Sequence, residues 1–174
     1  MPSSKKRETK ETCIEAFLNI KGQGQIHVET GIELLDEILL AIGRGGGFDL
    51  KVTAKGDAET GDHHTTEDVA ITLGSVLAEE VQGGIGSSTV PSGQSLATAA
   101  VRFGEPGYHG NFSLKSSTLS GMDLENFSHL LRALAYNGRF TLAISATGGD
   151  DRSQIEAMST ALGRAIKKAA RDHT

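Results

Sequence analysis

The chain of 174 residues contains no tryptophan and a single cysteine, Cys13. A lone cysteine rules out an intramolecular disulfide and a cysteine metal cluster, so we expect a cytoplasmic protein. The sequence has no apolar run close to the ~20 residues that cross a membrane. Residues 1–11 are polar and basic and lack the apolar segment of a signal peptide. Neither export nor a membrane partner is therefore expected.

Charge and motif content argue against three further classes of function. The formal net charge of −5 argues against nucleic acid as a partner. The glycines at 43–47 are not followed by the Gly-Lys-Ser/Thr of a phosphate-binding loop. Ser87-Ser88 and Ser116-Ser117 have no partner histidine in a nucleophile motif, which leaves serine hydrolysis with little support. Glycine is abundant, with 22 residues, and together with good apolar periodicity it predicts an ordered fold with many tight turns.

Apolar periodicity predicts a mixture of strands and helices. Strands are predicted at 12–20, 25–29, 48–52, 88–90, 96–103, 111–114 and 140–144. Helices are predicted at 32–42, from 63 to about 83, at 123–136 and at 152–170. The segment 25–29 is expected to form a hairpin with 12–20, and the glycines at 43–47 to end the first helix. A turn-rich loop is expected at Gly56–Asp62.

The predicted elements occur twice in the same order. In each half a helix, a glycine stop, a Phe-x-Leu-x-Val/Ile strand and a Gly/Asp loop precede a second helix, which starts at His63 in one half and Arg152 in the other. Glu67 and Glu156 occupy matching places, so an internal duplication explains the pattern. We predict an α+β fold, a duplicated two-layer α/β sandwich with a sheet on one side and helices on the other. The chain is expected to be a single domain, 1–174, of two fused repeats, about 1–86 and 87–174.

The second helix of the first half begins with the most informative residues of the chain, His63-His64-Thr65-Thr66-Glu67. On a helix, His63 and Glu67 are four residues apart and His64 and Glu67 are three apart, so imidazole and carboxylate groups can meet at one ion. This combination suits manganese, iron, zinc or nickel better than calcium. The alternative is a polar helix start, with Asp62 as N-cap and acidic residues favoured by the helix dipole.

At these residues the chain resembles the imidazoleglycerol-phosphate dehydratases, the manganese enzymes of histidine biosynthesis. The resemblance extends from about Arg7 to Ala170 and rests on several segments that follow one another in the family's order and spacing. These segments are Arg7-Glu8-Thr9-Lys10-Glu11-Thr12, Thr30-Gly31-Ile32 with Leu35-Asp36, Gly46-Gly47-Phe48, Lys55-Gly56-Asp57 and His63–Asp68.

The resemblance implies the fold, chemistry and assembly of that family. The fold would consist of ribosomal-protein-S5-domain-2-like repeats, and the reaction would be the metal-dependent loss of water from imidazole glycerol phosphate, a small phosphorylated imidazole. Subunits of the family form a large symmetric shell and build their manganese sites jointly, so self-association into a homo-oligomer is expected. By position, Glu11 is the candidate catalytic residue for proton transfer. The candidate metal ligands are His63, His64, Glu67, His129, Glu156 and Glu37.

The family's second metal motif is incomplete in this chain. Its paired histidines correspond to Arg152 and Ser153, and a further expected histidine is Glu37. Glu37 can still ligate manganese, whereas a guanidinium has no lone pair to offer. Glu156 and Asp151 are available to Arg152 as ion-pair partners. We therefore expect one manganese site at most.

Substrate-facing positions differ as well. Gln94 stands where the family has a carboxylate that exchanges protons, and Glu105 where it has an arginine that binds phosphate. Two hypotheses follow. The chain is a carbon–oxygen lyase that dehydrates imidazole glycerol phosphate, or it is a non-catalytic paralogue that acts as a scaffold, a mixed-assembly partner or a small-molecule-binding protein. The lost groups would act mainly in the transition state, which on physical grounds favours the paralogue.

Overall fold

The computed structural model describes residues 2–56 and 62–173, and its elements form two matching sets. The first set is β1 (Ser3–Glu8), β2 (Thr12–Asn19), β3 (Ile26–Glu29), α1 (Glu33–Gly46), β4 (Asp49–Gly56) and α2 (Asp62–Glu80). The second set is β5 (Ile85–Ser92), β6 (Ser95–Phe103), β7 (Gly107–Asn111), β8 (Thr118–Leu119), β9 (Met122–Asp123), α3 (Glu125–Asn137), β10 (Phe140–Thr147) and α4 (Asp151–His173). Most of the loop predicted at Gly56–Asp62 lies outside the described residues.

The two sets build sheets of the same topology. The strand order is β1-β2-β4-β3 in the first sheet and β5-β6-β10-β7 in the second. In each sheet the last pair is parallel and the other pairs are antiparallel. In the part of the chain that the structure describes, the short β8–β9 hairpin is present only in the second set. The predicted duplicated α+β sandwich is therefore confirmed.

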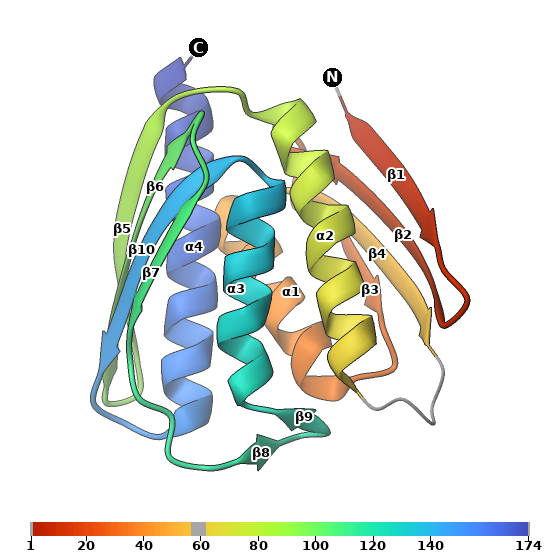
Figure 1. The fold of residues 1–174 in the computed structure, drawn as a ribbon. Helices are drawn as coiled ribbons and strands as arrows, with labels where there is room; N and C mark the ends of the chain where they lie inside the picture. The colour runs from red at the N-terminus through yellow and green to blue at the C-terminus, as the bar shows by residue number, and fades with distance from the viewer. Residues whose placement is uncertain (1, 57–61, 174) are drawn as a thin grey trace.

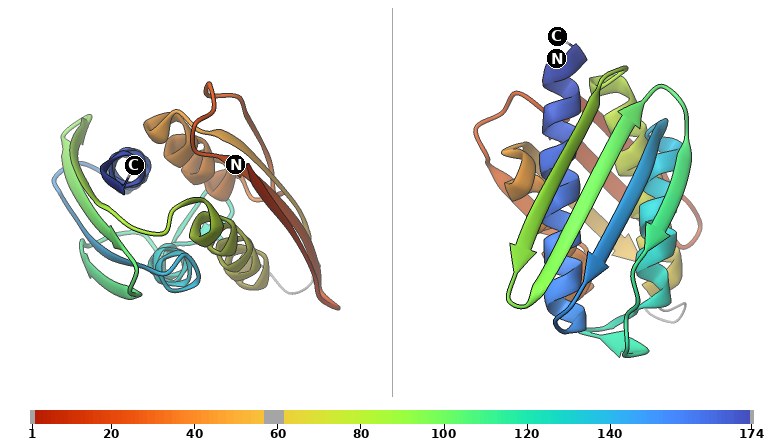
Figure 2. Two further views of the ribbon diagram at one scale, coloured as in Figure 1. Left: turned by 90° about the horizontal axis from the view of Figure 1, so that it is seen from above. Right: turned by 90° about the vertical axis from the view of Figure 1, so that its left-hand side faces the viewer.

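The four helices lie between the two sheets. Figure 1 shows one sheet on each outer side of the molecule, and the view from above in Figure 2 shows the same layers. Each sheet is covered on its inner face by the helices of its own repeat, which gives the two-layer unit expected from the sequence. Across the middle, α1 packs against α4 and α2 packs against α3, so each helix pair joins the two repeats.

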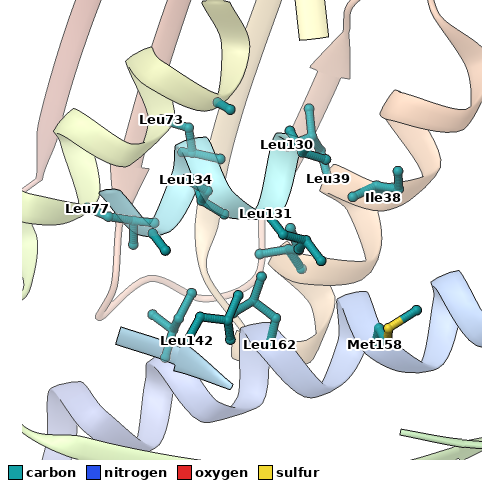
Figure 3. Close-up of a cluster of buried hydrophobic side chains, with 14 of the residues drawn as sticks. Ile38, Leu39, Leu73, Leu77, Leu130, Leu131, Leu134, Leu142, Met158 and Leu162 are labelled. Atoms are coloured by element: carbon teal, nitrogen blue, oxygen red, sulfur yellow. The ribbon is translucent and has the colours of Figure 1, made fainter. Parts of the chain in front are cut away.

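The hydrophobic core extends through the helical layers. Apolar residues recur at helical spacing in α1 and α3, and the stripes that they form are buried. Figure 3 shows these stripes meeting side chains of α2, α4 and β10. The labelled residues are Ile38, Leu39, Leu73, Leu77, Leu130, Leu131, Leu134, Leu142, Met158 and Leu162. In the described part of the chain, no helix is long and apolar enough to span a membrane.

Glycines lie at the contacts between the paired helices. A Cβ atom at Gly163 of α4 would overlap the backbone carbonyl oxygen of Ile42 in α1 and would lie 3.0 Å from the backbone nitrogen of Gly46. A Cβ atom at Gly74 of α2 would lie 2.8 Å from Cβ of Asn137 in α3. Glycine at these positions allows the helix backbones to approach closely.

The predicted hairpin between the first two strands is wrong. The segment 25–29 contributes β3, which pairs in parallel with β4 and not with β2. The carboxylate of Asp49 accepts hydrogen bonds from the backbone N–H groups of Gln23 and Gln25, both at 2.9 Å. These bonds fix the preceding loop to the start of β4, and the chain then continues alongside that strand.

The glycines at 43–47 do not stop the first helix at the predicted place. Helix α1 continues to Gly46, and Gly47 ends it with a left-handed backbone φ of 66°, a conformation that glycine adopts without strain. Gly43 is buried, and a Cβ atom there would lie 2.8 Å from Cδ1 of Ile26. This glycine thus remains helical and lets β3 approach the helix.

Strand β1 was not predicted from periodicity. It is polar and mostly exposed, yet it pairs with β2 along its whole length, from Ser3 opposite Leu18 to Glu8 opposite Cys13. Charged residues are frequent on edge strands because they discourage pairing with another chain. A polar sequence is therefore compatible with this position at the edge of the sheet.

Candidate metal site

A groove between α2 and α3 brings together three of the candidate ligands. His63 and Glu67 lie one helical turn apart on α2, with Nε2 of His63 3.7 Å from Oε2 of Glu67. The ring of His129, on α3, has its centroid 5.9 Å from that of His63. We name this the first groove. It is lined by His63, Glu67, Ile71, His129, Arg132, Ala133, Tyr136 and Asn137.

A buried amide holds His63 in one tautomer. Nδ1 of His63 lies 3.0 Å from Oδ1 of Asn126, and Nδ2 of Asn126 donates to Oδ2 of Asp62 at 2.9 Å. Because the carboxylate of Asp62 can only accept, it fixes which end of the amide faces the histidine. The Nδ1–H group of His63 is therefore the donor, and the lone pair of the neutral ring is on Nε2, the atom that faces Glu67.

Sequence reasoning missed Asn126 and treated Asp62 only as a helix cap. Asn126 is 4% exposed and precedes His129 by three residues, which places both on one face of α3. That spacing is the signal in the sequence that indicates its role. Asp62 also accepts a hydrogen bond from the backbone N–H of Asp123 at 3.1 Å. It thus connects the start of α2 to the segment that leads into α3.

His64 contacts Glu11, which is the candidate catalytic residue. Nδ1 of His64 is hydrogen-bonded to Oε2 of Glu11. Glu11 lies in the turn between β1 and β2, where Oγ1 of Thr9 accepts the backbone N–H of Glu11 at 3.2 Å and that of Thr12 at 3.0 Å. The pocket at this turn is lined by Thr9, Lys10, Glu11, His64, Glu67 and Asp68. Glu67 therefore borders both this pocket and the first groove.

The turn that carries Glu11 is attached to α2 through Asp68. The carboxylate of Asp68 accepts hydrogen bonds from Nε of Arg7 at 3.2 Å and from Oγ1 of Thr12 at 2.5 Å. These contacts give the segment Arg7–Thr12 a physical role, because they hold the carboxylate of Glu11 beside the first turn of the helix that carries the histidine pair.

A second groove, between α1 and α4, contains the remaining candidates, Glu37 and Glu156. Arg152 donates from Nη1 to Oε2 of Glu37 and from Nη2 to Oγ of Ser120. The ion-pair partner of Arg152 is thus neither Glu156 nor Asp151 but a residue of α1. The long arginine side chain reaches across the groove, where close packing of α1 and α4 places a carboxylate.

The seven candidate residues do not form one cluster. Three line the first groove, two lie at the β1–β2 turn and two line the second groove. Among the described residues, no three His, Cys, Asp or Glu side chains converge closely enough to hold a metal ion. The side chains of His63 and Glu67 are 50% and 52% exposed, so their donor atoms are accessible from outside the chain.

Helix α4 begins with a buried carboxylate, Asp151. Its oxygens accept hydrogen bonds from the backbone N–H groups of Lys115 at 2.7 Å and Ser116 at 2.8 Å. Burial raises the pKa of Asp151, but these two hydrogen bonds, a side-chain hydrogen bond with Ser116 and the positive charge of Lys115 together outweigh it and leave the pKa below its usual value. The ionised carboxylate therefore stabilises the fold.

We expect Asp151→Asn to make folding less sensitive to acid. The pKa of Asp151 in the folded state lies below the unfolded value of about 3.9, so its stabilising effect is present above that pH and is lost as the pH falls through the folded-state pKa. The free energy of unfolding in urea should therefore fall less between about pH 7 and about pH 2 in the variant than in the wild type. The exposed Glu125→Gln serves as the control, and an equal fall in all three proteins would contradict this role of Asp151.

Comparison with known protein families gives a consistent match. The sequence profile of the family described as imidazoleglycerol-phosphate dehydratase matches residues 30–166. The imidazoleglycerol-phosphate dehydratase of Desulforudis audaxviator is 37% identical over 173 residues, which cover 95% of this chain and 88% of the relative. The corresponding enzyme of a Thermoanaerobacter species is 39% identical over 173 residues, covering 95% and 89%. That of Methanothermobacter thermautotrophicus is 37% identical over 175 residues, covering 97% and 90%.

Solved structures show the same relationship. The crystal structure of imidazoleglycerol-phosphate dehydratase from Staphylococcus aureus superposes with a TM-score of 0.86 at 28% identity, covering 97% of this chain and 98% of that one. The enzyme from Pyrococcus furiosus gives a TM-score of 0.81 at 27% identity, with coverage of 95% and 93%. The likeness thus includes both repeats.

Proposed function

The chain belongs to the imidazoleglycerol-phosphate dehydratase family, and we propose that it is a metal-dependent dehydratase of histidine biosynthesis that acts on imidazole glycerol phosphate. The first groove carries this proposal. There the Nε2 lone pair of His63 faces the carboxylate of Glu67 at 3.7 Å. Two electron-pair donors repel each other unless a proton or a metal ion lies between them. A divalent ion that both atoms ligate removes this repulsion.

The donor set fits manganese. Two imidazoles of the first groove, from His63 and His129, and the carboxylate of Glu67 combine the ligand types that manganese accepts, and the imidazole of the proposed ligand His64 follows on the same turn of α2 in the adjoining pocket. The hydrogen bond from Nδ1 of His63 to Asn126 is the kind of outer contact that orients a ligating histidine. When bound, the ion would act as a Lewis acid toward the imidazole of the substrate. In this proposal Glu37 and Glu156 remain in the second groove, apart from the ion.

Glu11 is the residue that we propose for proton transfer. Loss of water removes a proton from one carbon of the glycerol chain and the hydroxyl group from its neighbour, and the resulting enol becomes the ketone, imidazole-acetol phosphate. The hydrogen bonds that Thr9 accepts order the turn that carries Glu11, and the carboxylate of Glu11 contacts His64, beside the ligand set. A positioned carboxylate of this kind can accept and return a proton.

We propose that other copies of the chain complete the site in the cytoplasm. Among the described residues, this one chain does not assemble three converging ligands, and the side chains of His64 and Glu11 are each 44% exposed. A homo-oligomer whose contacts cover these residues would supply the missing donors. The division of the chain into one domain of two repeats, about 1–86 and 87–174, remains a prediction alongside this assembly.

The proposal is tested by direct assay of imidazole-acetol phosphate. Purified protein is stripped of metal, supplied with manganese and given imidazole glycerol phosphate. Product should form with manganese and not with the stripped protein. If the manganese-loaded protein forms no product, the dehydratase proposal fails even if the protein is folded and oligomeric.

A second candidate function is a non-catalytic paralogue that serves as a scaffold, a mixed-assembly partner or a small-molecule-binding protein. The ion pair of Arg152 with Glu37 favours it, because this pair occupies the place of the family's second metal motif. Two other residues also favour this candidate. Gln94 stands where the family has a residue that exchanges protons, and Glu105 where it has one that binds phosphate. For this candidate we expect one metal ion or none per chain and no turnover in the same assay.

A further inference from the structure

The first and second grooves are built from matching positions of matching helices. His63 and Arg152 are each the second residue of their helix, α2 and α4. His129 and Glu37 are each the fifth residue, of α3 and α1. Glu67 and Glu156 lie four residues after His63 and Arg152, respectively. Each groove is thus lined by the same three helical positions, with different side chains.

In the second groove, the carboxylate of Glu37 already has a positively charged partner, the guanidinium of Arg152. In the first groove, two imidazoles and a carboxylate offer electron pairs, and the arginine that lines it, Arg132, lies over the ring of Tyr136, with its guanidinium carbon 5.1 Å from the ring centroid. In the second groove the guanidinium of Arg152 supplies a permanent positive charge and binds the carboxylate of Glu37 directly. A guanidinium has donors but no acceptor, so it cannot ligate a metal ion. A divalent ion placed here would be repelled by Arg152 and would have to displace it from Glu37.

The guanidinium also joins three elements. One nitrogen of Arg152, on α4, donates to Glu37 on α1 and another donates to Ser120, in the turn between β8 and β9. Ser120 has a positive φ of 45°, a conformation that costs energy for a serine. Its backbone oxygen accepts the N–H of Leu34 in the first turn of α1 at 3.2 Å. The β8–β9 turn is therefore held against the start of α1 by the backbone and against α4 by Arg152.

We propose that Arg152 is a built-in cation: its guanidinium, in place of a divalent metal ion, holds α1, α4 and the β8–β9 turn together at the second groove. This groove consequently excludes metal, and a metal ion that the chain binds resides at the first groove. The inference relies on the proposed function only for the identity of the first groove as the metal-binding one.

The test compares metal content in four proteins loaded with manganese, dialysed and measured by mass spectrometry of the metal. They are the wild type, His63→Ala/His64→Ala, Arg152→His/Ser153→His, and the combination of all four substitutions. We expect one, zero, two and one ions per chain, respectively. The extra ion in Arg152→His/Ser153→His is expected for two reasons. The new histidines offer lone pairs, and removal of Arg152 frees Glu37 from its ion pair. Glu156, one helical turn after position 152, adds a further carboxylate.

Further substitutions identify the source of the gained ion. Adding Glu37→Gln to Arg152→His/Ser153→His should remove that ion, whereas Arg152→Lys/Ser153→Ala, which keeps the charge, should gain none. No gain with the histidines, or an ion in His63→Ala/His64→Ala that Glu37→Gln removes, would overturn the proposal. If the wild type binds no ion and Arg152→His/Ser153→His binds one, the proposed function fails at the first groove and the inference on Arg152 stands.

Discussion

Replacing His63 with alanine is expected to remove metal binding and dehydration together. His63 is the residue whose lone pair faces Glu67 and whose ring adjoins that of His129. Loss of an outer-shell partner alone typically costs about 10–100-fold in metal affinity, so loss of a ligand should exceed about 100-fold. Manganese affinity is measured by titration calorimetry, and product formation is measured in the same preparations. In His63→Ala, turnover should fall to the level of the metal-stripped wild type.

Two further variants provide an intermediate and an unchanged manganese affinity with which His63→Ala is compared. Asn126→Ala keeps every proposed ligand but removes the hydrogen bond that fixes the tautomer of His63, so its manganese affinity should fall between those of the wild type and His63→Ala, by about 10–100-fold. His109→Ala, on the exposed part of β7, should bind manganese like the wild type. The assignment is refuted if His63→Ala and His109→Ala behave alike.

Sequence reasoning was most successful where local geometry decides the arrangement. A spacing of four residues on a helix places His63 and Glu67 on one face, and their 3.7 Å separation follows from that. The contact of His64 with Glu11 joins residues 53 positions apart. No local rule predicts such a contact, because it depends on where the β1–β2 turn lies in the folded chain. Glu11 was therefore proposed only through the family resemblance.

The ion pair of Arg152 is a second contact that local sequence rules do not predict. The sequence offered Glu156 and Asp151 as partners within α4, but the ion pair joins Arg152 to Glu37, 115 positions earlier. The close approach of α1 and α4 decides the outcome. At β3 the sequence predicted a strand correctly and its partner wrongly, because strand propensity carries no information on pairing and the carboxylate of Asp49 determines the direction of the loop.

The substitution Gly163→Ala is expected to destabilise the fold strongly. On helix propensity alone, alanine should stabilise α4 by about 1 kcal/mol. The added Cβ atom, however, would overlap the carbonyl oxygen of Ile42 and lie 2.9 Å from its carbonyl carbon. These are backbone atoms of a packed helix, which cannot move aside as a flexible side chain can. Overpacking of this kind costs about 1–3 kcal/mol or more, so the net loss in the free energy of unfolding should reach about 2 kcal/mol in urea titrations followed by circular dichroism.

Gly74→Ala is the matched control, because Gly74 has the corresponding place between α2 and α3. The added atom would lie 2.8 Å from Cβ of Asn137 and 3.0 Å from two backbone atoms, the nitrogen of Gly138 and the oxygen of Leu134. None of these contacts is as short as the overlap with the oxygen of Ile42, so a smaller helix shift relieves them. The loss should therefore be smaller than for Gly163→Ala, and an equal or larger loss would contradict the account.

Displacement of α1 from α4 would also separate Glu37 from Arg152 while leaving the first groove in place. Folded Gly163→Ala protein should then retain its manganese, whereas Gly74→Ala should bind it more weakly, because the spacing of α2 and α3 positions His63 relative to His129.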